Sequence, residues 1–432
     1  MAEETSSNQT SINIRDVTEV VSSIQGKLCQ KCPIPSKCSI FRVPDRLRRH
    51  NEKAFEPELV SIGPFHHRKE KLQAMQKIKL WYLHCLLDRA PTKKTTLECF
   101  VEAIGRIEQE CRACYACEIG FVEKDFIEMM VVDGCFIIEL LRKASGEVQP
   151  DEEDPVLYTP WMNWRLASDL RLLENQLPWH VLDCLFDLTK SHDEQTSLPN
   201  LVLSSYNFKW PPRDNLKHEH ILDCLRNSLI GTCTITLASE NLHGNLIMST
   251  SPIPSVIELV QAGVKFKVGD KNSSLLDVTF KHGVMTIPPR FVWEDTEYLN
   301  RSLISFEQCD PSKDFKITSY AKLFDDLIKT SQDVDFLKDK GILGLYLSAE
   351  DAASIFKRLY RDASVGAFLY SDLYREVNAY CRQPCNRWRA MLKRDYFSNP
   401  WAITSLMVAF LILVFTFSQT LYSVLSYYKS PS

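Results

Sequence analysis

Apolar residues near the N-terminus follow a helical spacing. Ile14, Val17, Val21, Ile24 and Leu28 recur at steps of three and four residues, which predicts one apolar stripe along an amphipathic helix. The stripe extends over about two heptads, which is short for a coiled coil. We therefore expect this helix to dock against the rest of the chain.

The middle of the chain has the pattern of a larger helical layer. Helical spacing of apolar residues predicts helices over residues 71–87 and 97–117. Residues 124–143 are apolar on nearly every face, which is typical of a helix at the centre of a core. Another helix is predicted over residues 169–190, where Pro178 must kink or restart it because proline has no amide hydrogen to donate.

The apolar pattern changes to a period of two after residue 264. Leu276, Val278 and Phe280 share one face, Gly283 allows a turn, and the alternation then continues, which predicts a small antiparallel β element. Ser255 with Glu258 forms a capping box ahead of it. Helices are then expected over residues 297–308, 318–329, 331–340, 348–360 and 369–397. The predicted fold class is mainly α with a small antiparallel β element.

Turn-forming and polar stretches divide these elements. Pro44, Pro57 and Pro64 break residues 38–67 into short extended pieces, and residues 191–215 and 238–254 have the composition of long loops. The predicted organisation is a polar tail with an amphipathic helix (1–37), a single globular body (38–397), a transmembrane helix (401–425) and a short tail (426–432).

The C-terminal segment is long and apolar enough to cross a bilayer. Residues 401–428 carry no charge, and about 20 apolar residues suffice to span the hydrocarbon layer. Aromatic residues at the two ends suit the membrane interfaces. The predicted anchor is represented by Trp401, Phe410, Leu413, Phe417 and Tyr422. The alternative interpretation is a helix buried in the core.

The charges that flank this segment predict its orientation. Basic residues precede it, at Arg387, Arg389, Lys393 and Arg394, and only Lys429 follows it. The positive-inside bias therefore places the body in the cytosol. The first residues are polar and acidic and do not form a signal peptide, so a tail anchor is expected. In the opposite orientation the sequons at Asn8, Asn272 and Asn300 could be glycosylated.

Composition and net charge say little about the class of partner. The chain has 432 residues, of which 45% are apolar and 25% charged, as in ordinary globular proteins. Its formal net charge of −4 gives no reason to expect a nucleic-acid partner.

Fifteen cysteines raise the possibility of a metal or redox site. The odd number excludes a complete set of intramolecular disulfides. Cys29 and Cys32 form one CxxC pair, and Cys111, Cys114 and Cys117 follow one another at steps of three within a predicted helix. On a helix, each such step turns a side chain by about 60°, so the three thiols would fan over about 120° and would not converge on one metal ion. Buried or unreactive thiols are favoured, and a zinc site that joins the two pairs is the alternative.

Polar residues interrupt two apolar segments. Asp133 lies in "MMVVDGCFIIELL", and Glu174 and Asn175 lie in "LRLLENQLPW". A buried carboxylate must be paired or hydrogen-bonded, so the favoured interpretation is structural: Asp133 or Glu174 caps a neighbouring backbone or pairs with an arginine. Suitable arginines are Arg42, Arg46 and Arg171. The alternative is a polar pocket that these residues form with His66 and His67.

The two histidines follow a turn in "SIGPFHHRKEKLQAM". Gly63 and Pro64 favour the turn, and adjacent residues do not share a helix face. His66 and His67 are therefore unsuited to bind one metal ion together. We expect a structural junction in which one histidine fixes the turn by hydrogen bonding.

Motifs for known chemistry are missing from the sequence. It has no Walker A loop, no GxSxG elbow and no HExxH pair. In the "HEH" of residues 218–220, alternate side chains point to different faces of a helix, which disfavours a metal site there. Neither an enzyme nor a bound cofactor is predicted.

Several motifs together resemble the plant domain-of-unknown-function 247 family, the UPF0481-type membrane proteins. They include "CSIFRVPDRLRRHNEKAFEPELVSIGPFHH", "MVVDGCFIIELL", "DLRLLENQLPW", "SLLDVTFKHGVMTIPP" and "YFSNPWAI". The resemblance runs from about Cys38 to the C-terminus. It implies a flowering-plant protein with one C-terminal span and no established enzymatic activity. Some grass members are associated with self-incompatibility loci, which implies a role in recognition.

We therefore expect a non-enzymatic, membrane-anchored plant protein that acts by protein–protein recognition, in signalling or in recognition of the pollen–pistil type. Its partner is another protein or a second copy of itself, and its last helix contacts membrane lipid. One alternative is an enzyme that uses His66 or His67 with Asp133 or Glu174 as a general base. A carboxylate within hydrogen-bond reach of either imidazole would keep that alternative open. The other alternative is a thiol-based redox or metal sensor.

Overall fold

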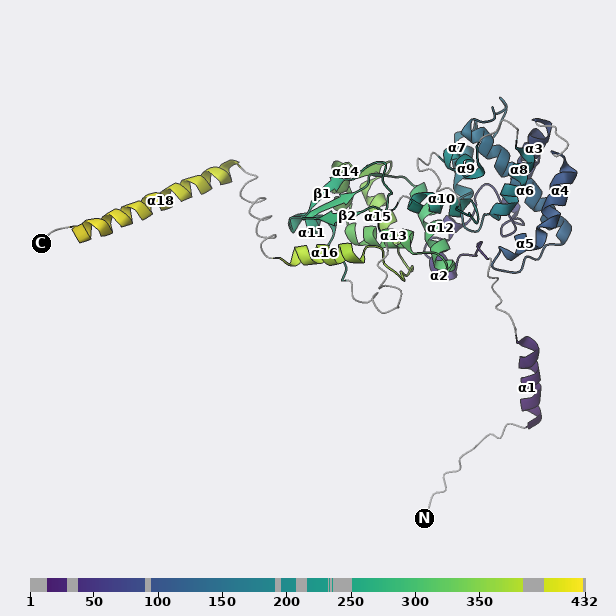
Figure 1. Cartoon of the computed structure of the whole chain (residues 1–432), viewed down its shortest axis with the longest axis horizontal. Helices are drawn as coiled ribbons and strands as arrows, with labels where there is room; N and C mark the ends of the chain where they lie inside the picture. The colour runs from purple at the N-terminus through teal and green to yellow at the C-terminus, as the bar shows by residue number, and fades with distance from the viewer. Residues whose placement is uncertain are drawn as a thin grey trace, which may run out of the picture.

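The computed structural model of the chain describes residues 14–28, 38–89, 95–190, 196–206, 216–231, 233, 235, 251–383 and 400–429. A helical body occupies the centre, and the helices α1 (Ile14–Lys27) and α18 (Pro400–Lys429) extend from it separately (Figure 1). The predicted fold class is confirmed: the chain is mainly helical with a small β element and one long apolar helix near its C-terminus.

The first half of the body is built around α6 (Glu123–Ser145), which is buried along most of its length. Around it pack α3 (Ala74–Arg89), α4 (Leu97–Arg106), α8 (Trp179–Thr189) and α9 (Leu198–Ser205). A Cβ on Gly134 would lie 2.5 Å from Leu185 Cδ1, so this glycine permits the close approach of α8. The central helix predicted for residues 124–143 is confirmed.

The second half of the body contains both small sheets. In the first, β2 (Thr279–Lys281) and β3 (Val284–Ile287) form the predicted antiparallel hairpin, and Gly283 turns with φ +75°. The strand β1 (Lys265–Val268) pairs with β3 in parallel. The second sheet joins β4 (Arg290–Val292) to β5 (Leu343–Leu345), also in parallel.

Helices surround these sheets, and capping side chains define where they begin. Ser255 and Glu258 form the predicted capping box of α11 (Val256–Gln261). Ser348 accepts a hydrogen bond from the Asp351 amide (3.1 Å) at the start of α15 (Ala349–Leu359). The other helices of this half are α12 (Asp295–Cys309), α13 (Lys316–Leu327), α14 (Ser331–Asp339) and α16 (Ser371–Arg382).

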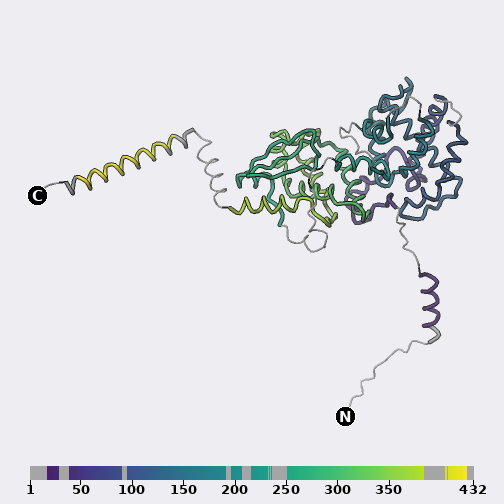
Figure 2. Tube along the Cα trace, viewed as in Figure 1, coloured from purple at the N-terminus to yellow at the C-terminus, as the bar shows by residue number. Residues whose placement is uncertain are grey.

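Two clusters of buried apolar residues form the core, one in each half. The segment 38–65, which includes α2 (Asp45–Arg48) and η1 (Glu52–Phe55), contributes to both. Ile40 and Val60 lie in the first cluster, whereas Phe41 and Phe55 lie in the second. The trace in Figure 2 runs from one half into the other without a gap between them.

Buried ion pairs connect the two halves. Arg171 pairs with Asp295 at the start of α12, and Ser168 donates to the same carboxylate at 2.6 Å. On α10 (Ile221–Gly231), Arg226 donates to Glu307 Oε1 at 2.8 Å. The predicted limits of a single body at 38–397 stay a prediction, because residues 384–399 lie outside the described part.

Three expectations about helices were wrong in detail. The predicted helix 97–117 is interrupted at Ile107 and divides into α4 and α5 (Glu108–Ala113). Between α7 (Pro160–Asp169) and α8, the segment 170–178 is a series of turns, although Pro178 does restart the helix as predicted. The predicted loop 191–215 contains α9.

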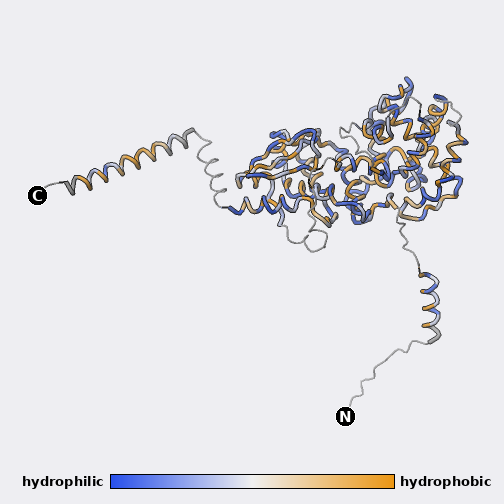
Figure 3. The backbone as a smooth tube through the Cα atoms, viewed as in Figure 1, coloured by the Kyte–Doolittle hydropathy of each residue, from blue (hydrophilic) through white to orange (hydrophobic). Residues whose placement is uncertain are grey.

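The amphipathic helix forms as α1, but its apolar stripe is not docked. Val17 is 46% exposed and Ile24 is 54% exposed. Figure 3 shows the same stripe on α1, and a long hydrophobic stretch in the middle of α18. The apolar face of α1 therefore remains open in this structure.

Candidate functional site

Side chains on α6 and α3 support the turn at Gly63 by hydrogen bonding. Asp133 on α6 accepts from the Gly63 amide (2.9 Å) and from Lys79 Nζ on α3 (2.5 Å). Asp133 and Lys79 are both buried, and Lys79 also donates to the Ser61 carbonyl. Gly63 has φ +68°, and a Cβ there would lie 2.8 Å from the Gln176 carbonyl oxygen. Only glycine fits this position without strain.

The segment after α7 holds the backbone that leads into the turn. Asn175 Oδ1 accepts from the Ile62 amide (2.7 Å), and Asn175 Nδ2 donates to the Val60 carbonyl (3.1 Å). The carboxylate of Asp169 accepts from the amides of three successive residues, Glu58, Leu59 and Val60. Buried side chains thus satisfy an extended backbone that has no neighbouring strand.

Glu174 lies in a separate, charged network. It accepts from the Val43 amide (2.7 Å) and from Arg48, and the Arg42 guanidinium is 3.9 Å away. Burial alone would raise the pKa of Glu174, but His66, Arg48 and the Val43 amide outweigh it and lower the pKa to about 2. Glu174 is therefore a fixed anion. Its main arginine partner, Arg48, was not among the three expected, whereas Arg42 was.

His66 contacts this carboxylate from the cavity side. Its side chain is 2% exposed, and Nε2 lies 3.2 Å from Glu174 Oε2. Its other ring nitrogen, Nδ1, is buried and has no hydrogen-bond partner among the described residues. Burial lowers the pKa of His66 below its usual value, with Glu174 opposing the shift. The ring is therefore neutral near pH 7.

His67 points elsewhere. Its ring meets Phe121 edge to face at 5.6 Å between centroids, and burial lowers its pKa as well. The structure thus brings His66 and Glu174 together, whereas Asp133 and Asn175 hold the backbone of the turn. The expectation that a histidine fixes the turn by hydrogen bonding was wrong, because these two side chains do so. Sequence reasoning missed Lys79 and Asp169, which complete the support.

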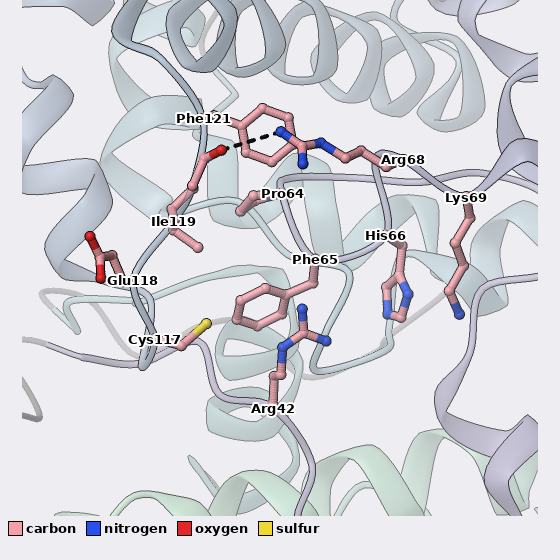
Figure 4. A pocket seen from close by; sticks show the side chains of 11 residues that line it. Arg42, Pro64, Phe65, His66, Arg68, Lys69, Cys117, Glu118, Ile119 and Phe121 are labelled. Carbon is pink, nitrogen blue, oxygen red and sulfur yellow. Dashed lines mark hydrogen bonds between the residues drawn. The ribbon is translucent and has the colours of Figure 1, made fainter.

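Beside the turn lies a cavity of about 350 Å³. It is lined by Arg42, Pro64, Phe65, His66, Arg68, Lys69 and residues 117–121. Figure 4 shows the Arg42 guanidinium against the Phe65 ring and that of Arg68 against Phe121. Each guanidinium carbon is 4.5 Å from its ring centroid. The cavity is therefore mainly cationic, with aromatic walls.

The cysteines are spread over different environments. Cys111 on α5 is buried, with Sγ 3.3 Å from His180 Nε2, whereas Cys117 is exposed. The helix α5 ends at Ala113, and Cys114 follows it with a backbone that is still helical (φ −75°, ψ −17°), whereas Cys117 lies beyond the helix. Burial is the main cause that raises the pKa of Cys111, and it raises that of Cys38 to about 12.

No metal centre is found in the described part of the chain. No group of three or more His, Cys, Asp or Glu residues there is arranged to hold an ion. The candidate thiols Cys29 and Cys32 lie outside the described residues. The "HEH" segment caps a helix instead: His220 Nδ1 accepts from the Asp223 amide (3.1 Å), and its Nε2 lies 3.2 Å from the Ser39 carbonyl oxygen.

The predicted anchor corresponds to α18. Residues Met407–Leu425 form a stretch long and apolar enough to cross a membrane, judged by length and composition. Within it, Phe410, Leu413, Phe417 and Tyr422 are exposed. Trp401 lies in the first turns of α18. The flanking basic residues Arg387, Arg389, Lys393 and Arg394 lie outside the described part of the chain.

Known proteins resemble this chain over nearly its whole length. Residues 40–415 match a family described as plant protein of unknown function, DUF247. The UPF0481 protein At3g47200 of Arabidopsis thaliana is 29% identical over 420 residues, covering 90% of this chain and 87% of that protein. The putative UPF0481 protein At3g02645 of the same plant is 24% identical over 476 residues, covering 87% and 88%. No solved structure matches the chain significantly.

Proposed function

The chain belongs to the DUF247 family of plant proteins of unknown function, and from this premise we propose that it is a non-enzymatic, membrane-anchored protein that acts by protein–protein recognition. The recognition we propose serves signalling at a membrane surface, of which pollen–pistil recognition is one kind. The body binds the partner, and α18 holds the body at the bilayer.

The observation that supports recognition is the cavity beside the turn. Its lining combines guanidinium groups with aromatic rings, a combination enriched where proteins bind one another. The carboxylates Asp133 and Glu174 are occupied by backbone amides and by Lys79 and Arg48. Asp133 supports the turn at Gly63, and Glu174 supports the backbone at Val43.

Membrane attachment rests on α18 and has its own test. The full chain and a Leu413→Arg/Phe417→Arg variant are expressed in plant cells, and membranes are extracted with alkaline carbonate. Each arginine near a helix centre opposes insertion by roughly 2.5–3.5 kcal/mol, so the variant should move to the soluble fraction. A Ser426→Arg control, beyond the apolar stretch, should stay with the membrane. Extraction of the unaltered chain by carbonate would contradict the anchor.

Orientation is a separate question, which protease protection on intact membranes answers. A cytosolic body is digested by added protease without detergent, and an N-terminal tag is lost with it. A protected body that carries glycans at Asn272 would instead reverse the proposed orientation. This residue lies exposed in a turn, where it is open to modification.

Partner recognition is tested by proximity labelling from the full, anchored chain. The matched control is α18 fused to an unrelated body of similar size, which labels whatever shares the membrane. The proposal expects a reproducible set of proteins enriched over this control. If repeated experiments give no enriched protein, recognition is not the function.

One observation favours the enzymatic alternative: the imidazole of His66 lies 3.2 Å from a carboxylate oxygen of Glu174. A neutral histidine that is oriented by an anion and borders a cavity has the arrangement of a general base. Chromogenic ester and phosphoester substrates test this alternative. Turnover by the unaltered chain that is lost in His66→Gln but retained in His67→Gln would favour an enzyme over our proposal.

A further inference from the structure

We propose that the cavity beside the turn binds a carboxylate side chain from an acidic segment of a partner protein, clamped between the guanidinium groups of Arg42 and Arg68. This inference rests on the proposed function, because it specifies the partner's chemistry.

The two guanidinium groups are fixed in place with hydrogen-bonding capacity to spare. A guanidinium held over an aromatic ring is attracted to the ring face and can still donate N–H bonds to an anion. Arg68 donates to the Gly120 carbonyl at 3.2 Å, and the nearest carboxylate oxygen to Arg42 is 3.9 Å away. Each group has five N–H donors, so both retain donors for a ligand. The rings reduce the entropy lost when those donors bind.

His66 gives a second, independent indication of a missing ligand. Its ring lines the cavity and is 2% exposed; Nε2 lies 3.2 Å from Glu174 Oε2, whereas Nδ1 has no hydrogen-bond partner among the described residues. A buried polar group without a partner costs roughly 1–3 kcal/mol. A neutral imidazole has one donor and one acceptor nitrogen; with Nε2–H facing Glu174, Nδ1 is the acceptor, and a backbone N–H of the bound segment would satisfy it. Figure 4 shows His66 beside Arg42 on one side of the cavity.

The charge balance favours a carboxylate over a phosphate. Lys69 is paired with Glu56 at 2.9 Å, and burial leaves His66 neutral. Arg42 and Arg68 are therefore the principal cations available. Glu118 lines the cavity and Glu174 lies behind Arg42, so a phosphate dianion would be opposed by both carboxylates. A single negative charge matches the site.

The size and walls of the cavity fit a side chain on a peptide. A volume of about 350 Å³ is at the low end of the range for ligand pockets. Pro64, Phe65, Ile119 and Phe121 offer apolar contacts to the stem of a glutamate and to a neighbouring residue. Protein segments supply this combination of a carboxylate and an apolar neighbour.

The experiment measures peptide binding to the full chain in detergent micelles. The probes are fluorescent hexapeptides that carry one Glu or Asp next to a leucine, at each internal position and at a free C-terminus. Matched peptides replace the acid by Gln or Asn, or by phosphoserine. The inference expects saturable binding of acidic peptides, at least tenfold weaker binding of the amide forms, and no gain with phosphoserine. It is wrong if no acidic peptide binds, or if phosphoserine or inorganic phosphate binds more tightly.

Arginine variants locate the binding. Arg42→Gln and Arg68→Gln should each weaken it about tenfold, which is within the range for a charged hydrogen bond. Arg375→Gln removes the same charge from an exposed arginine on α16 and should leave binding unchanged. Thermal melting of each variant confirms that it remains folded. Equal binding by all three variants would overturn the inference.

Protection of Cys117 provides a readout that does not depend on affinity. This exposed thiol lines the cavity, so a bound acidic peptide should slow its alkylation, as followed by mass spectrometry. Cys381 on α16 serves as the internal control. Unchanged alkylation of Cys117 at saturating peptide would place the binding elsewhere. Because these assays need neither a membrane nor a cellular partner, their failure is distinguishable from failure of the proposed function.

Discussion

The buried pair of Asp133 and Lys79 allows a quantitative test of the support beneath the turn. In Asp133→Asn the shape of the side chain is kept, but its charge is removed. The Lys79 ammonium, which is 0% exposed, then keeps only the Ser61 carbonyl as a described partner. Breaking a buried ion pair from one side costs roughly 3–5 kcal/mol, because it leaves an uncompensated charge.

That cost is large compared with the stability of most proteins, which is about 5–15 kcal/mol. We therefore expect the urea midpoint of Asp133→Asn to fall by about 1 M or more, given typical slopes of roughly 1–3 kcal/mol/M. Tryptophan fluorescence of the full chain in mild detergent follows the transition, since the chain has eight tryptophans. Asp335→Asn, at an exposed position on α14, controls for the chemical change itself.

A double variant separates the charge from the packing. In Lys79→Met/Asp133→Asn the unpaired ammonium is gone, while the asparagine oxygen can still accept from the Gly63 amide. This variant should be more stable than Asp133→Asn alone, because an apolar replacement of a buried pair is often tolerated. The reasoning is refuted if Asp133→Asn unfolds at the same urea concentration as Asp335→Asn. That result would favour a polar pocket over a structural role.

Three further predictions concern titration, backbone strain and thiol reactivity. Burial lowers the pKa of His220 to about 4, so the unfolded chain binds a proton between pH 6.5 and 4 that the folded chain does not. The free energy of unfolding should therefore fall as the pH is lowered through this window, by about 1.4 kcal/mol per pH unit from this residue. His220→Asn keeps an acceptor for the helix cap, and it should reduce the slope of unfolding free energy against pH by the equivalent of one proton. Gly63→Ala should destabilise the chain by at least about 1 kcal/mol more than Gly146→Ala, measured by urea unfolding. Both positions have positive φ, but of the two only Gly63 has neighbours within 4 Å of an added Cβ. Equal losses of stability would contradict the close contact with Gln176. Iodoacetamide at pH 8 should label the exposed Cys117 long before Cys111, Cys135 and Cys224, whose thiols are buried and have raised pKa values. Rapid labelling of Cys111 would favour the thiol-sensor alternative.

The elements that sequence could predict are those determined by local interactions. Apolar residues on all faces indicate the helix α6, and the alternation of apolar and polar residues around Gly283 indicates the hairpin of β2 and β3. The parallel pairing of Arg290 with Leu343 joins residues far apart in the chain, so no local pattern indicates it. Residues 170–178 have helical apolar spacing, yet Asn175 and Gln176 bond to nearby carbonyls, which competes with a helix.

Some residues of the site could also be identified from the sequence, whereas others become apparent only in the fold. Asp133, Glu174 and Asn175 were identifiable because they interrupt apolar segments, which makes a buried polar role necessary. Lys79 was not identifiable, because a lysine in an amphipathic helix is usually exposed. Only the packing of α3 on α6 buries the Lys79 side chain. The cavity was also beyond sequence reasoning, since Arg42, Arg68 and Phe121 come from three separate segments that only the fold brings together.

The segment 38–65 has a consequence for the order of events during synthesis. Its apolar side chains are divided between the two cores, with Ile40 in one and the next residue, Phe41, in the other. It emerges from the ribosome early, yet the second core includes residues as late as Val377. Translation proceeds at about 5–20 residues per second. The apolar side chains of this segment are therefore synthesised many seconds before the residues that they contact in the second core. Newly made chains should therefore depend on chaperones until the last helices are complete, and removal of the first 55 residues should leave both cores unfinished.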